Sequence, residues 1–170
     1  MLRAKKRGEF KSMFREMSRK NKQLSKEECL RILKEEKRGV LSVNGDDGYP
    51  YGMPMNHFYH DEDGKLYFHC GQGGHRTDAL ERNEKVSFCV YDSGYRNADE
   101  WALNVKSVIV FGRIEIVDDF EQIVDIATKL SHKFTSDEAY IKNEIARHAQ
   151  RTRLLVLTPE HISGKSVQES

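Results

Sequence analysis

Residues 48–76 constrain the fold of this chain more than any other stretch of the sequence. They indicate two strands joined by a tight Asp-Glu-Asp-Gly turn. A glycine-rich loop at 71–74 follows the second strand at once. The loop ends in His75 and Arg76 and leads into a short helical stretch at 77–82. The sequence therefore predicts an antiparallel hairpin that delivers a flexible, cationic loop to the start of a helix.

This loop has the chemistry of a phosphate site. Glycine lets the backbone come close to a bound group, and the first amides of a helix point at that group unpaired. However, Gly71, Gly73 and Gly74 fit neither the G-x-G-x-x-G pattern nor the G-x-x-x-x-G-K-[ST] pattern. From the residues alone, a phosphate site and a plain surface loop both remain open.

Composition limits the class of protein. A chain of 170 residues is expected to form one domain, and its net charge of +1 gives no reason to expect a nucleic-acid partner. No apolar run is as long as a membrane span, and the start of the chain has no secretory h-region. Cys29, Cys70 and Cys89 are odd in number and widely spaced, which argues against a disulfide framework and favours a reducing, cytoplasmic location.

Charge is concentrated at the start of the chain. Residues 1–22 contain nine Lys or Arg against two Glu. Four apolar side chains in this stretch recur at the spacing of one helix face: Phe10, Met13, Phe14 and Met17. We therefore expect a basic helical arm over residues 1–24, packed on the domain or on a second subunit. A nucleic-acid arm and a patch for anionic membranes are the alternatives.

The rest of the chain, 25–165, is expected to form a mainly β domain, followed by a tail at 166–170. Hydrophobic patterns and turn signals predict about six strands, at 39–44, 51–60, 64–70, 85–91, 103–117 and 153–158. Gly112 predicts a bend or bulge within the fifth of these strands. Many strands joined by turns favour an antiparallel β-barrel with peripheral helices over a parallel sheet.

Helices are predicted between and around these strands. Ser25 and Glu28 form a capping-box pattern that opens a helix over 26–36. Apolar residues at helical spacing predict a second helix over 119–134. A third helix is expected over 137–149 with Ser136 as its N-cap.

The hairpin and its loop resemble the FMN-binding split-barrel family. The resemblance lies in the order of three segments: Tyr49-Pro50-Tyr51-Gly52-Met53-Pro54-Met55-Asn56, then Leu66-Tyr67-Phe68-His69-Cys70, then Gly74-His75-Arg76. That family includes the pyridoxamine-phosphate oxidases and the nitroimidazole-resistance-type flavoproteins. Residues 14–25, 106–112 and 162–165 are also similar to the nitroimidazole-resistance group, so the likeness spans roughly 14–165.

The resemblance implies a six-stranded antiparallel split barrel that forms a homodimer with FMN at the subunit interface. The strand 53–56 suits the flavin ring, because Met adapts to an aromatic surface and Pro stiffens a strand. The relatives carry a small hydroxyl residue where this chain has Gly74, which leaves an amide but no hydroxyl for the phosphate. The implied cofactor-binding residues are Met53, Pro54, Met55, Asn56, Phe68, His69, Cys70, Gly74, His75, Arg76 and, from the neighbouring subunit, Ser107.

The function implied by the resemblance is that of an FMN-dependent oxidoreductase acting on small nitroaromatic-type molecules, with NAD(P)H as a candidate electron donor. His69 is the candidate catalytic residue, because a histidine can protonate a reduced substrate near neutral pH. A non-enzymatic flavin or haem sensor is the alternative. Pyridoxamine-phosphate oxidation is a further alternative, although no second cluster of Arg and His near the C-terminus is present to hold the substrate's phosphate.

Other chemistries find less support in the sequence. His57 and His60 fall on opposite faces of one predicted strand, so they cannot share a metal ion, and no C-x-x-C or H-E-x-x-H pattern accompanies them. We therefore expect no metal site. Hydrolysis by a nucleophile is not indicated either, since there is no G-x-S-x-G motif.

Overall fold

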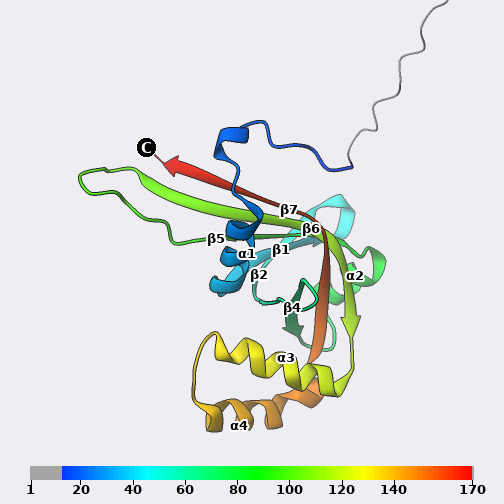
Figure 1. Cartoon of the computed structure of the whole chain (residues 1–170). Helices are drawn as coiled ribbons and strands as arrows, with labels where there is room; N and C mark the ends of the chain where they lie inside the picture. Colours follow the sequence, from blue (N-terminus) through cyan, green and yellow to red (C-terminus); the bar gives the residue numbers. More distant parts are fainter. Residues whose placement is uncertain (1–12, 170) are drawn as a thin grey trace, which may run out of the picture.

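The strands of this protein form one curled antiparallel sheet, seen in a computed structural model that describes residues 13–169 (Figure 1). Their order across the sheet is β2-β1-β5-β6-β7-β4-β3. The strands are β1 (Arg38–Asn44), β2 (Pro50–Asn56), β3 (Phe58–His60), β4 (Lys65–Cys70), β5 (Lys85–Tyr91), β6 (Leu103–Val117) and β7 (Arg153–Glu169). The mainly β antiparallel fold is confirmed, with seven strands where six were expected.

Helices lie at the periphery of this sheet (Figure 1). The α-helices are α1 (Lys26–Glu35), α2 (His75–Arg82), α3 (Phe120–His132) and α4 (Glu138–His148). Three 3-10 turns accompany them: η1 (Lys20–Lys22), η2 (Asp46–Gly48) and η3 (Ala149–Arg151). The capping box that opens α1 is formed as predicted, since the Ser25 side chain accepts from the amide of Glu28 and the Glu28 side chain accepts from the amide of Ser25.

The two longest strands, β6 and β7, form the spine of the sheet. They pair from Leu103 opposite Glu169 to Val117 opposite Leu154. The register shifts between Phe111 and Gly112, which confirms the predicted bulge. Here the two backbones approach so closely that a Cβ on Gly112 would lie 2.2 Å from the carbonyl oxygen of Thr158.

Two apolar clusters form the contacts between the sheet and its helices. The larger one fills the inside of the curled sheet under α1, and its fully buried members include Leu33, Leu41, Phe68, Phe88 and Leu155. The smaller one lies under α3, on the opposite face of β4 and β7, and comprises Tyr67, Ile123, Ile126, Ala149, Leu154 and Val156. Successive side chains of β7 point to opposite faces of the sheet. Leu154 and Val156 therefore belong to the second cluster, and Leu155 and Leu157 belong to the first.

Several predicted boundaries differ from the structure. The predicted strand at 51–60 breaks at His57 into β2 and β3, because this side chain turns inward and its Nε2 lies 2.8 Å from the carbonyl oxygen of Leu33 at the end of α1. The last helix is capped by Asp137 and not by Ser136, since the Asp137 side chain accepts from the amide of Tyr140. The helix after the glycine loop begins at His75, two residues earlier than predicted.

The last strand was predicted far too short. It was expected over 153–158, yet β7 continues to Glu169 and absorbs most of the expected tail at 166–170. The second half of β7 is mostly polar and shows no clean alternation. It is a strand because it pairs with β6 along its whole length.

The described part of the N-terminal arm, 13–24, contains the 3-10 turn η1 and no α-helix. Phe10 and the rest of the arm before Met13 lie outside the described residues. The arm packs on β7: the amide of Leu24 donates to the carbonyl of Gly164, and the ring of Phe14 stacks on that of His161 with centroids 4.8 Å apart. Residues 14 and 24 thus contact β7, and the helical arm expected over 1–24 stays a prediction. No helix in the described chain is long and apolar enough to cross a membrane.

Candidate functional site

A cavity of about 430 Å³ lies between strand β2 and the start of helix α2. Residues 51–54 line one side of it, and residues 73–76 line the other. Strand β2 is an edge strand, bonded only to β1 within the described sheet. Pro54 is tolerated there because an edge strand needs no amide on its free side. Parts of the first and third segments that carried the resemblance are thus brought together around one cavity, which we call the loop cavity; residues 66–70 do not line it.

The loop cavity has room for a ligand close to the backbone. Gly74 adopts a φ of +110°, a conformation open to glycine and rarely to other residues. A Cβ placed on Gly71, Gly73 or Gly74 would meet no atom within 4 Å. The glycines therefore face open space, and the first amides of α2 are left for an anion.

Arg76 supplies the positive charge of the loop cavity. Its Nη1 lies 3.0 Å from the sulfur of Met55, so the guanidinium rests on the inner end of β2. Its Nε is buried and has no hydrogen-bond partner among the described residues. Arg76 lines the cavity, so its guanidinium can form a charge-assisted hydrogen bond to an anion placed there.

His75 is fixed beside this guanidinium by two contacts. Its ring stacks on Tyr51 with centroids 4.3 Å apart and an interplanar angle of 11°. Its Nε2 lies 3.3 Å from a carboxylate oxygen of Asp46, whose other oxygen accepts from Arg82 at 2.5 Å. Asp46 thereby ties both ends of α2 to the β1–β2 turn.

The glycine loop is held from its other side by β7. Arg153 donates to the carbonyl of Gln72 at 3.3 Å and pairs with both carboxylate oxygens of Asp118, at 2.6 and 2.7 Å. The hydrogen bond from Arg153 holds the pKa of Asp118 below its usual range. The Gln72 side chain in turn donates to the carbonyl of Gln150.

Some of the predicted site residues belong to the core. Met53 and Met55 are 7% and 8% exposed, and Phe68 and Cys70 are also buried. Their side chains support the site from beneath, and Met53 alone of these four lines the loop cavity. Burial raises the pKa of the Cys70 thiol, which therefore stays protonated at neutral pH.

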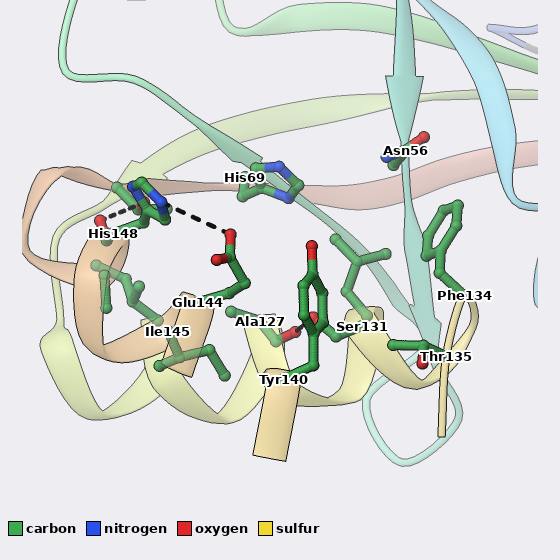
Figure 2. Close-up of a pocket in the computed structure, with 14 residues that line it drawn as sticks. Asn56, His69, Ala127, Ser131, Phe134, Thr135, Tyr140, Glu144, Ile145 and His148 are labelled. Carbon is green, nitrogen blue, oxygen red and sulfur yellow. Dashed lines mark hydrogen bonds and ion pairs between the residues drawn. The ribbon is translucent and has the colours of Figure 1, made fainter. Parts of the chain in front are cut away.

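Asn56 and His69 line a second cavity, of about 460 Å³, between the sheet and helices α3 and α4 (Figure 2). Burial lowers the pKa of His69, and the charge of Arg76 lowers it further. The imidazole is therefore uncharged at neutral pH. We call this space the helix cavity.

Ser107 is separate from both cavities. It lies on β6 opposite Lys165 and Tyr91 and lines neither the loop cavity nor the helix cavity. The resemblance placed it in the site of the neighbouring subunit, so its role stays a prediction.

Sequence reasoning missed three contributors to the site. Tyr51 was part of the quoted motif, and its ring position beside a loop histidine became evident only in the structure. Asp46 and Arg153 lie 29 and 77 residues from His75 and Arg76, respectively, and carried no local signal. Contacts that depend on strand order cannot be read from a short motif. No group of three or more His, Cys, Asp or Glu in the described chain is placed to hold a metal ion.

The curled antiparallel sheet, with the loop cavity at its β2 edge, defines a split-barrel protein. The family model described as pyridoxamine 5'-phosphate oxidase matches residues 25–166. The chain therefore belongs to the pyridoxamine 5'-phosphate oxidase-like split-barrel superfamily. Among curated proteins, no match was found.

Solved structures share the fold at low sequence identity. One is named for 5-nitroimidazole antibiotic resistance and comes from Bacteroides thetaiotaomicron: it is 18% identical, covers 85% of this chain and 86% of its own, and has a TM-score of 0.70. A conserved hypothetical protein from Mycobacterium tuberculosis is 19% identical over 88% and 90%, with a TM-score of 0.73. An FAD-binding protein from Mesorhizobium loti is 23% identical over 85% and 96%, with a TM-score of 0.61.

Proposed function

We propose that this protein binds FMN and acts as an oxidoreductase on small nitroaromatic-type molecules. The observation that carries the cofactor assignment is that Arg76 and His75 line one cavity together with the backbone of Gly73 and Gly74, at the start of α2. The loop cavity suits the phosphate, with Arg76, His75 and the first amides of α2 as its donors. The FAD-binding protein from Mesorhizobium loti has the same fold, which supports a flavin.

In this proposal the bound flavin supplies the electron transfer, and the chain supplies binding and proton control. Met53 and Pro54 present the edge of β2 to the ring, and Met55 packs in the core behind them. His69, uncharged at neutral pH, offers one N–H donor and one acceptor nitrogen to a molecule in the helix cavity. The nitroaromatic assignment is supported by the structural neighbour named for 5-nitroimidazole resistance.

Titration with FMN tests the cofactor assignment. Purified protein should quench FMN fluorescence and elute with the visible absorbance of the flavin, whereas a protein of the same size without a flavin site should not. Absence of both signals at micromolar FMN would contradict the proposal. Anaerobic bleaching of the bound flavin by NADH or NADPH, followed by reoxidation with a nitroaromatic compound, tests the reaction.

We further propose that the protein is a homodimer with the flavin between subunits. Support comes from large apolar side chains exposed on β6 and its hairpin, among them Ile109, Phe111 and Trp101, the last 80% exposed. Exposed apolar side chains of this kind are typical of subunit contacts. Light scattering should report about twice the 19.7 kDa chain mass. A monomer that binds FMN tightly would show that Ser107 has no part in the site.

A further inference from the structure

The helix cavity combines an apolar floor with a polar rim. Helices α3 and α4 contribute Ile123, Ala127, Leu130 and Ile145 to its floor. The rim carries His69, Asn56 and Tyr140, and Figure 2 shows the Tyr140 ring standing between Glu144 and Phe134. A volume of about 460 Å³ is that of a small-molecule site. Apolar side chains facing a few polar groups suit a flat aromatic ring with a polar substituent.

Among the described residues that line the helix cavity, Glu144 is the one carboxylate, and His148 lines the cavity beside it. None of the lining residues, all of which lie in the described chain, is Lys or Arg. The Glu144 side chain is 38% exposed, and its ion-pair contacts are long, with His148 at 3.6 Å and Arg147 at 3.7 Å. His69 adds no positive charge at neutral pH, because its pKa is lowered. The rim therefore presents a loosely paired carboxylate, in contrast to the cationic loop cavity.

We propose that the helix cavity is the substrate site and that Glu144 selects flat aromatic molecules that carry a protonated amine and no anionic group. The proposal rests on the proposed function, because it names the substrate class of that oxidoreductase. A carboxylate without a close partner attracts an ammonium group and repels another carboxylate. The apolar floor from α3 and α4 accepts the ring. In this proposal the loop cavity binds the anionic phosphate of the cofactor, and the helix cavity binds the amine-bearing substrate.

Three matched nitroaromatic probes test this selection: 4-nitrobenzylamine, 4-nitrobenzyl alcohol and 4-nitrobenzoate. Their affinities are measured by calorimetry or ligand-observed NMR, first on the protein without flavin and then with FMN added. The amine should bind tightest and the carboxylate weakest, with roughly a tenfold difference between them because attraction and repulsion both contribute. Equal affinities for the three probes in the wild-type protein would overturn the proposal.

Two variants with the same change of charge assign the effect to Glu144. Glu144→Gln should reduce the difference between amine and carboxylate to within about twofold. Glu138→Gln is the control: it removes a carboxylate from the same helix, one that is 76% exposed and lines no part of the cavity. The control should keep the wild-type preference. A preference that persists in Glu144→Gln would place the selection elsewhere and refute the role of Glu144.

A third variant locates the site without changing charge. Ala127→Leu adds volume to the floor of the cavity at a helix position that tolerates leucine. It should weaken all three probes together, and unchanged binding would show that the probes bind elsewhere. FMN fluorescence quenching is recorded separately. Selective probe binding without FMN binding would refute the flavin function alone, whereas FMN binding without probe selectivity would refute this inference alone.

Discussion

The imidazole of His75 lies flat on the ring of Tyr51, with centroids 4.3 Å apart and planes inclined by 11°. This contact joins the first residue of α2 to the edge strand β2 across the loop cavity. It fixes the direction from which the first amides of the helix face the cavity. A site held in this way loses little conformational entropy when it binds an anion.

The first prediction separates phosphate recognition from ring recognition. Arg76→Ala should weaken FMN binding by roughly ten- to a hundredfold, because a charge-assisted hydrogen bond is worth about 1.5–3 kcal/mol. Riboflavin lacks the phosphate, so its affinity should hardly change. Both affinities are measured by fluorescence titration, with Arg31→Ala, which removes an exposed cation paired to Glu35, as the control. Equal losses for the two ligands would mean that Arg76 supports the loop structurally.

The second prediction concerns Asp46. Asp46→Asn removes the charge that holds His75 at 3.3 Å and Arg82 at 2.5 Å, and should weaken FMN binding by roughly two- to fivefold, the range of exposed ion pairs. The effect should shrink at high salt, where these pairs are screened. Asp61→Asn breaks the exposed pair with Lys34 and serves as the control. An unchanged affinity would show that the contacts of Gln72 suffice to hold the loop.

The third prediction tests the bulge between β6 and β7. Gly112→Ala would place a Cβ 2.2 Å from the carbonyl oxygen of Thr158, so the backbones must separate. We expect a loss of about 2 kcal/mol or more in the free energy of unfolding, measured by urea denaturation. Gly71→Ala meets no atom within 4 Å and should change stability by less than about 0.5 kcal/mol. Similar values for the two variants would contradict the close approach seen at the bulge.

Local signals in the sequence predicted local structure well. The Ser25–Glu28 capping box, the strand at 85–91 and the bulge at Gly112 each depend on a few neighbouring residues, and the structure confirms them. The strand at 153–158 was predicted too short, because the polar half of β7 is held by pairing with β6 and not by its own pattern.

The sequence predicted only part of the lining of the loop cavity, and the roles of those residues stay predictions. The resemblance brought Pro54 and Arg76 into one site, and both line the loop cavity. Neither the split between two cavities nor the position of Glu144 in the helix cavity could be predicted. Both depend on how α3 and α4 pack over the sheet, which no short motif records.

The fourth prediction concerns Lys133, a partly buried cation at the end of α3. Lys133 donates to the carbonyls of Glu36 and His57, at 2.5 and 3.1 Å, and so joins the end of α3 to the end of α1 and to the break between β2 and β3. Burial lowers its pKa to about 8, so it is still protonated at pH 7. Lys133→Met should lower the free energy of unfolding by about 1–3 kcal/mol, because two carbonyls lose a charged donor.

The matched control for this variant is Lys129→Met, on the same helix. It breaks only the exposed pair with Asp125 and should change stability by less than about 0.5 kcal/mol. Thermal and urea denaturation of the two variants provide the comparison. If both variants were equally stable, Lys133 would contribute no more than a surface lysine.

The last prediction is a pH dependence of stability that arises at His57. This side chain is 0% exposed, and its Nε2 lies 2.8 Å from the carbonyl oxygen of Leu33, which it reaches as a neutral donor. Burial lowers its pKa from 6.5 to about 3, with the charge of Lys133 as the second cause. Between these two pH values His57 is protonated in the unfolded chain but remains neutral in the folded protein. Stability should therefore fall on acidification, by up to about 1.4 kcal/mol per pH unit from this group.

Urea denaturation between pH 6.5 and 5 measures this slope before most carboxylates titrate. His57→Gln removes the titrating group, so the variant should be less stable at pH 7 but should lose less stability than the wild type over that interval. His132→Gln, which changes a histidine 42% exposed beside Glu138, should keep the wild-type slope. A His57→Gln slope as steep as that of the wild type would assign the acid sensitivity to other groups. In that case the buried imidazole would take up its proton without unfolding the chain.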